Sequence, residues 1–239
     1  MNAFGLLAAG GSAKQYELLY VWDQATPEAK VIIFCLAIFS VMAWSVMVAK
    51  TLQMRRARKL NHFFNAEYRS QKHVLEVFDR RVQAPGCPLF MVYQAGSVEL
   101  DARLKTPEGG RKKQVSLKGI EHVKRSLENT VARESLKLES GLILLAIAVS
   151  GGPFLGLLGT VWGVMSTFGH VAQQQSASLL AMAPGVAAAL ITTVAGLLVA
   201  IPSMFGYNWL VHNLRVQTVE LDNFAQDLIS KIETEYLDD

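Results

Sequence analysis

Three threonine hydroxyls are the side chains best suited to chemistry in the long uncharged part of this sequence. Thr160, Thr192 and Thr193 lie between Gly141 and Leu214, a stretch that contains no Asp, Glu, Lys or Arg. A hydroxyl in such surroundings has two uses. It can donate to a carbonyl of its own helix, or it can line a hydrated path for ions. The residues alone leave both uses open.

No carboxylate accompanies these hydroxyls. The two histidines of the stretch, His170 and His212, are placed near its outer and inner ends, where a histidine is more often an interface residue than a proton relay. Passing a proton across a bilayer needs an ionisable group at membrane depth. The stretch contains none, so we predict that the chain does not conduct protons by itself.

Other kinds of site are not predicted. The sequence has no cysteine–histidine spacing typical of metal ligands, no phosphate-binding loop and no nucleophile motif. Its two cysteines, Cys35 and Cys87, are too few for a disulfide scaffold, and we expect both to be reduced thiols. We predict neither an enzyme nor a bound metal or cofactor.

Two membrane-spanning helices must position the hydroxyls. One helical crossing needs about 20 apolar residues, and the uncharged stretch is long enough for two. We predict crossings over residues 141–168 and 181–210. Between them, a short periplasmic turn over residues 169–180 contains the polar run Gln173-Gln174-Gln175.

Small residues recur on one face of each of these helices, four, three and four positions apart. Such faces let two backbones approach closely, so we predict that they serve helix packing and partner contact. Prolines are predicted to kink the helices. The small residues are Gly152, Gly156, Gly159 and Gly163 on the first helix and Gly185, Ala189, Thr192 and Gly196 on the second, and the prolines are Pro153, Pro184 and Pro202.

A further crossing is predicted over residues 27–49. Its start carries the capping hydroxyl of Thr26, followed by Pro27 and the acid Glu28. Basic residues from Lys50 onward mark the cytoplasmic side. Residues 1–26 then form a periplasmic segment, which we predict to be uncleaved and to hold an interfacial helix at 16–23.

Residues 50–140 and 211–239 have the composition of cytoplasmic helices. We predict a helix over Leu89–Leu104 and a longer one whose apolar positions continue from Ile120 to Leu145 without a break. The tail repeats this spacing, which predicts a C-terminal helix with a seam for a neighbour. We interpret the basic residues near the membrane as a solvated face that contacts anionic lipid, in preference to a nucleic-acid site.

Two segments of the uncharged stretch resemble a known family. GLLGTVWGVM (residues 156–165) and APGVAAALITTVAGLLVAIPSMFGYN (residues 183–208) are similar to the signature of the MotA/TolQ/ExbB membrane proteins, and TolQ/ExbB-type subunits are the most similar. The resemblance implies an all-α integral membrane protein of the bacterial inner membrane. It has three transmembrane helices, two of them extended far into the cytoplasm, and assembles as a ring, expected to be a homopentamer.

The resemblance also implies a function. Such subunits work with a single-span partner of the ExbD/TolR type, whose membrane aspartate carries the ion, and couple the proton motive force to work at the cell envelope. In the family, threonines at the positions of Thr160 and Thr193 face the ion-carrying helices. A glutamate is usual at the position of Ala188, and its absence here leaves the coupling ion open between H⁺ and Na⁺.

One alternative from another class is a static membrane scaffold for a single-span partner. It would be indifferent to collapse of the membrane potential, whereas an ion-driven motor would stop. The sequence also leaves open whether the work is TolQ-like envelope maintenance or ExbB-like outer-membrane transport.

Overall fold

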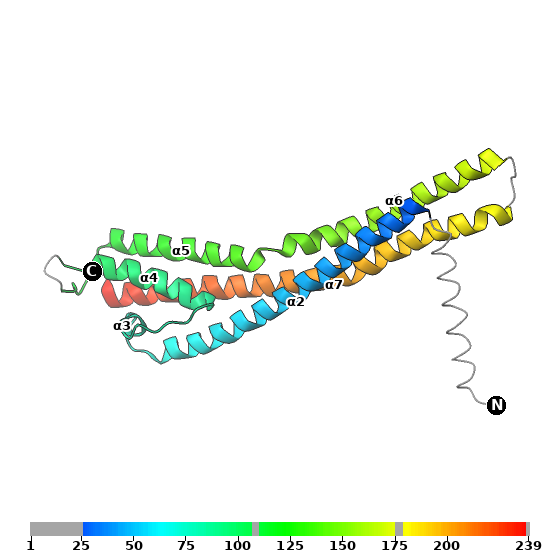
Figure 1. Cartoon of the computed structure of the whole chain (residues 1–239). Coiled ribbons are helices and arrows are strands. Elements are labelled where there is room, and N and C mark those ends of the chain that lie inside the picture. Colours follow the sequence, from blue (N-terminus) through cyan, green and yellow to red (C-terminus); the bar gives the residue numbers. More distant parts are fainter. Residues whose placement is uncertain (1–25, 107–109, 175–178, 238–239) are drawn as a thin grey trace, which may run out of the picture. The chain divides into compact units, whose positions relative to one another are not determined.

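The computed structural model describes residues 26–106, 110–174 and 179–237, and the described chain is mostly helical (Figure 1). It divides into two compact units. We call residues 1–47 and 141–207 the membrane unit, and residues 48–140 and 208–239 the charged unit. The helices in chain order are α2 (Pro27–Ser70), α3 (Glu76–Asp79), α4 (Pro88–Leu104), α5 (Leu117–Glu139), α6 (Leu142–Gln174) and α7 (Leu179–Tyr236).

Three of these helices are long and apolar enough to cross a membrane. The spans that meet both conditions lie within α2, α6 and α7, as many candidate spans among the described residues as the sequence predicts crossings. Helix α2 begins at Pro27, where the capping sequence predicts it. The hydroxyl of Thr26 accepts a hydrogen bond from the backbone N–H of Ala29 at 3.3 Å, so the predicted cap is present.

The predicted turn between the second and third crossings is wrong over residues 169–174. Helix α6 continues through this segment to Gln174, and α7 already begins at Leu179. Glutamine is a good helix former, so a polar run need not end a helix. Residues 175–178 lie outside the described residues, as does the interfacial helix predicted for residues 16–23.

The unbroken helix predicted from Ile120 to Leu145 is also wrong. Helix α5 ends at Glu139 and α6 starts at Leu142, because Gly141 has a φ of +86°, a left-handed conformation that favours glycine. Leu138, Leu142 and Leu145 are nevertheless all buried. The spacing of the buried leucines therefore continues across the helix break, so the sequence pattern does not indicate where the break occurs.

A lysine of α2 caps the end of α5. Lys50 is only 9% exposed, and its ammonium group donates to the carbonyl oxygens of Lys137 and Leu138 at 3.5 and 3.3 Å. These carbonyls belong to the last turn of α5, where the helix itself provides no N–H partner. Lys50 is the first charged residue after the uncharged part of α2, and its ammonium group also provides hydrogen bonds to the last carbonyl oxygens of α5.

The core of the charged unit is formed by α4, α5 and parts of α2 and α7, with a contribution from α3. Helix α4 confirms the helix predicted over Leu89–Leu104. The predicted seam of α7 is buried at Leu221, Ala225, Leu228 and Ile232, and Figure 1 shows this part of α7 running beside α4 and α5. Aromatic rings fill the centre. Phe64 and Tyr68 of α2 pack against each other and against Phe224 of α7, and both also contact Tyr93.

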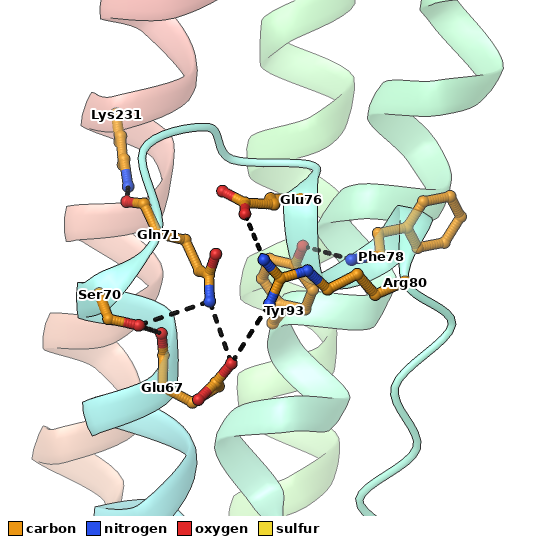
Figure 2. A network of polar contacts seen from close by, with 8 residues as sticks. All are labelled: Glu67, Ser70, Gln71, Glu76, Phe78, Arg80, Tyr93 and Lys231. Carbon is orange, nitrogen blue, oxygen red and sulfur yellow. Dashed lines mark hydrogen bonds and ion pairs between the residues drawn. The ribbon is translucent and has the colours of Figure 1, made fainter.

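Polar contacts hold the short α3 and the loop before it on this core (Figure 2). The hydroxyl of Tyr93 accepts from the N–H of Phe78 at 2.9 Å, as Figure 2 shows. It also donates to the carbonyl of Val74 at 2.7 Å. Arg80 pairs with Glu76 at 2.6 Å. On α2, Asn61 is buried, and its side-chain oxygen accepts from the N–H of Leu89, so α2 caps the start of α4.

Candidate functional site

The small-residue faces of α6 and α7 pack directly on one another within the membrane unit. A Cβ built on Gly156 would lie 2.8 Å from the carbonyl oxygen of Thr192, and one built on Gly152 would lie 3.1 Å from the carbonyl oxygen of Gly196. Such distances leave no room for a side chain at Gly156. Gly196 is the reciprocal case, since its Cβ would lie 2.5 Å from the carbonyl oxygen of Gly152. These backbones are therefore as close as the glycine spacing predicts.

The same contact continues toward the other end of both helices. A Cβ on Gly163 would lie 2.7 Å from that of Ala189, and Gly185 lies directly beneath the side chain of Thr167. Thr167 is buried and donates to the carbonyl of Gly163 at 2.8 Å. Thr167 was not among the residues predicted from the sequence. Its position four residues after Gly163, on the same helix face, is the signal that could have found it.

The three threonines selected from the sequence come together at the centre of this contact. Thr160 projects from α6, whereas Thr192 and Thr193 are neighbours on α7. The hydroxyl oxygens of Thr160 and Thr193 are in very short contact, and those of Thr160 and Thr192 are 3.4 Å apart. Thr192 is completely buried, whereas Thr160 and Thr193 are partly exposed.

Two backbone carbonyls complete the cluster. The carbonyl oxygen of Gly156 lies 3.0 Å from the hydroxyl of Thr192 and 3.2 Å from those of Thr160 and Thr193. The carbonyl oxygen of Ala189 lies 2.7 Å from the hydroxyl of Thr192 and 3.1 Å from that of Thr160. Each helix thus offers one carbonyl to hydroxyls of the other, in addition to its own hydrogen bonds.

Counting protons shows what this threonine cluster can do chemically. Each threonine hydroxyl has one proton to donate and two lone pairs to accept with. Thr192 can donate to the carbonyl of Ala189, Thr160 to the hydroxyl oxygen of Thr193, and Thr193 to the carbonyl of Gly156, which satisfies all three protons within the helix pair. The oxygens of the partly exposed Thr160 and Thr193 then keep lone pairs for an outside donor, such as a protonated carboxyl group, or for a cation.

Alanine occupies the position at which the resemblance predicts a glutamate. Ala188 is buried and packs against Ala29 of α2. Within the described part of the membrane unit, Glu28 is the only Asp or Glu, and it lies in the first turn of α2. One of its carboxyl oxygens is buried without a hydrogen-bond partner among the described residues. The histidines offer no substitute in the contact, because His170 and His212 are both exposed.

The remaining predicted residues fall inside helices. Pro153 lies within α6, and Pro184 and Pro202 lie within α7, so none of them ends its helix, and the kinks stay a prediction. Cys35 and Cys87 are both free thiols. The structure therefore brings together the hydroxyls and the small residues, while the ion path and the partner contact assigned to them remain predictions.

Known proteins of two names, TolQ and ExbB, are similar to this chain in sequence. The Tol-Pal system protein TolQ of Pseudomonas aeruginosa is 33% identical over 188 residues, which cover 78% of this chain and 79% of that protein. The biopolymer transport protein ExbB of Neisseria meningitidis is 29% identical over 213 residues, covering 88% and 94%. A shorter match, 44% identical over 113 residues, joins 47% of this chain to 45% of the biopolymer transport protein ExbB of Xanthomonas campestris.

A family model also matches residues 100–223, just over half of the chain, and this segment contains the threonine cluster and both small-residue faces. The match and the relatives point to the same group of multi-pass membrane proteins, in which three apolar helices are expected and found. The chain belongs to the MotA/TolQ/ExbB proton channel family.

Proposed function

We propose that this chain is the ring-forming subunit of an ion-driven motor of the bacterial inner membrane. Five copies would surround the membrane helices of an ExbD/TolR-type partner, whose aspartate carries the proton. The observation that carries the proposal is the threonine cluster, which presents two partly exposed hydroxyls in a helix pair that has no acid of its own in the contact. The relatives named TolQ and ExbB support the same assignment.

The chemistry follows from the proton count. When the partner's aspartate is protonated, its O–H can donate to the oxygen of Thr160 or Thr193, because the proton of Thr160 is held by Thr193 and that of Thr193 by the carbonyl of Gly156. The neutral acid then moves along the helix pair at a low electrostatic cost. When the acid releases its proton toward the cytoplasm, its negative charge returns and its hydrogen bond to the threonine is lost.

The membrane potential is large enough to drive such a step. Moving one elementary charge through 100 mV releases about 2.3 kcal/mol, which is comparable to the strength of one or two hydrogen bonds to a charged group. A few ions per step can therefore break and remake weak contacts between the ring and its partner. We propose that this work serves outer-membrane transport or envelope maintenance.

The orientation follows from the charges next to the helices. Lys50, Arg55 and Arg56 follow the uncharged part of α2, and Arg215 follows that of α7. By the positive-inside rule these flanks face the cytoplasm. The amino terminus and the α6–α7 connection are then periplasmic, and the C-terminus is cytoplasmic.

The test is to co-express the chain with its single-span partner and measure proton uptake in proteoliposomes. Replacement of Thr193 by Val removes one exposed hydroxyl but keeps the shape of the side chain. We expect the complex to assemble and the flux to fall about fivefold, the size of effect for losing one hydrogen bond between neutral groups, about 1 kcal/mol. Thr167→Val is the matched control, because Thr167 donates to a carbonyl of its own helix.

The same proteoliposome preparation tests two alternative functions. The alanine at position 188 favours a static scaffold, which would leave the partner's activity unchanged when an uncoupler collapses the potential. Hydroxyl and carbonyl oxygens are also ligands for Na⁺, so a sodium-coupled motor would stop when Na⁺ is replaced by K⁺ at constant pH. If the purified chain without any partner dissipates a proton gradient at a motor-like rate, the proposal fails.

A further inference from the structure

A cavity of about 800 Å³ opens in the charged unit between α2, the turn before α4 and the end of α5. Its α2 wall begins at Leu52 and includes Arg56, its α4 wall includes Met91, and its α5 wall includes Lys137. It shares no residue with the threonine cluster. We propose that this cavity binds the headgroup of an anionic phospholipid from the surrounding membrane, and this inference does not depend on ion coupling.

The depth of the cavity matches the headgroup layer. Leu52 is three residues beyond Ala49, the last residue of the uncharged part of α2, and Leu138 is three residues before Gly141, where the next uncharged stretch begins. The three residues of α2 are helical and rise about 4.5 Å. The headgroup region of a bilayer is roughly 5 to 8 Å thick on each side. The α2 wall is therefore at the level of lipid phosphates, and the α5 wall ends three residues before the next uncharged stretch.

The charge of the cavity suits an anion. Arg56 is exposed, and among the described residues it has neither an ion-pair nor a hydrogen-bond partner. The lining also contains the acid Glu134, which pairs with Lys137 at 2.6 Å, so these two charges cancel and the arginine is the unsatisfied charge of the lining. Lys50 adds a second positive charge nearby, because its ammonium group contacts the side chain of Gln53, another lining residue, at 2.9 Å. A guanidinium group can bind two phosphate oxygens at once.

The rest of the lining is uncharged and partly apolar. The α4 side consists of Met91, two prolines and Gly86, whose φ of +83° shapes the turn. Leu52 is 61% exposed, four residues before Arg56, so a lipid whose phosphate binds the arginine can lay its glycerol and upper acyl chain along the leucine. An acidic protein segment would satisfy the arginine but would leave this apolar side unused at headgroup depth.

The experiment uses the whole chain, assembled with its partner, in nanodiscs of mixed phosphatidylglycerol and phosphatidylcholine. Native mass spectrometry counts the phosphatidylglycerol that remains bound after release from the disc. We expect Arg56→Gln to lower its retention about tenfold, since a charge-assisted hydrogen-bond pair is lost. Arg55→Gln is the matched control on the neighbouring exposed residue outside the cavity, and it should change retention by less than about twofold.

A second variant tests the cavity independently of charge. Met91→Trp fills the space with a larger ring and should also lower phosphatidylglycerol retention while the helix content, measured by circular dichroism, is preserved. Equal losses for Arg55→Gln and Arg56→Gln would reduce the site to general surface attraction and overturn the proposal. Unchanged retention in both Arg56→Gln and Met91→Trp, as expected if a second copy covers the cavity, would overturn it as well. Displacement by millimolar inorganic phosphate would assign the cavity to a free anion instead.

Discussion

At the residue scale, the threonine cluster depends on one hydroxyl that solvent does not reach. Thr192 is completely buried and lies within hydrogen-bond distance of carbonyls from both helices, those of Gly156 and Ala189. It also occupies the space that a side chain at Gly159 would need, since a Cβ there would lie 2.5 Å from its hydroxyl oxygen. Thr192 therefore orients the pair of exposed hydroxyls instead of offering one itself.

Replacing Thr192 by Val should weaken the α6–α7 contact. The methyl group fills the same space, but the single hydroxyl proton that lies within reach of the carbonyls of Gly156 and Ala189 is lost, at a cost of about 1 kcal/mol for a hydrogen bond in a membrane protein. Thermal unfolding of the purified chain in detergent measures the effect. Thr192→Ser keeps the oxygen and should recover most of the loss, whereas equal melting temperatures for Val and wild type would show that the hydroxyl contributes nothing.

The sequence was sufficient to select these hydroxyls but not to describe their contacts. Thr160, Thr192 and Thr193 were identifiable because polar side chains are rare in an uncharged stretch. The contact between Ala188 and Ala29 was not, since alanine pairs carry no periodic or chemical signal. Lys50 is similar: it was interpreted as a flanking charge, and only the structure shows its ammonium group on the end of α5.

At the element scale, glycines of α6 contribute in opposite ways according to the face on which they lie. Gly156 faces α7, and a Cβ there would meet the backbone of Thr192 at 2.8 Å. Gly151 lies in the same helix, yet a Cβ there would have nothing within 4 Å. Backbone cannot move aside as a flexible side chain can, so only the first position requires glycine.

The two glycines should therefore respond to alanine with opposite signs. Gly151→Ala should raise the stability of the helix by up to about 1 kcal/mol, because alanine is the better helix former. Gly156→Ala should lower it, by about 1 to 3 kcal/mol for an overpacked contact. Unfolding of both variants under one set of detergent conditions provides the comparison, and a stabilised Gly156→Ala would show that α6 and α7 are not in close contact.

The helix ends were less predictable than the helix faces, for a physical reason. Apolar spacing identified the buried sides of α5, α6 and α7, because burial of a helix stripe is a repeated signal. A helix end depends on single residues. Gly141 interrupts a stripe whose leucines remain in register, and the run at Gln173 extends a helix that its polarity was expected to end.

At the scale of the whole molecule, the two units differ in how their stability depends on pH. The described part of the membrane unit contains one carboxylate, Glu28, whereas the charged unit contains many. The most enclosed ion pair there joins Asp101 to Arg111 at 2.7 Å, with Lys105 on the other carboxyl oxygen at 2.8 Å. Arg111 also binds Asp79, so this cluster ties α3, α4 and the start of the next loop together.

The pKa of Asp101 determines the expected pH dependence. Burial alone would raise this pKa, but hydrogen bonds from Lys105 and Arg111 outweigh burial and hold it below its ordinary value. A folded-state pKa below the unfolded one, about 3.9, stabilises the fold at higher pH. The stabilisation of the fold by the Asp101 carboxylate is therefore complete above about pH 5 and is lost as the pH falls through the folded-state pKa.

Acid should consequently open the charged unit before the membrane unit. Asp101→Asn lacks the carboxylate, so its melting temperature, followed by circular dichroism, should lie below that of wild type at pH 7 and approach it at pH 3. Asp222→Asn is the control, because Asp222 is exposed and has no ion-pair partner in the described chain. If the difference in melting temperature between wild type and Asp101→Asn stays constant from pH 7 to pH 3, the effect of the substitution is on packing. The ion cluster would then not stabilise the charged unit.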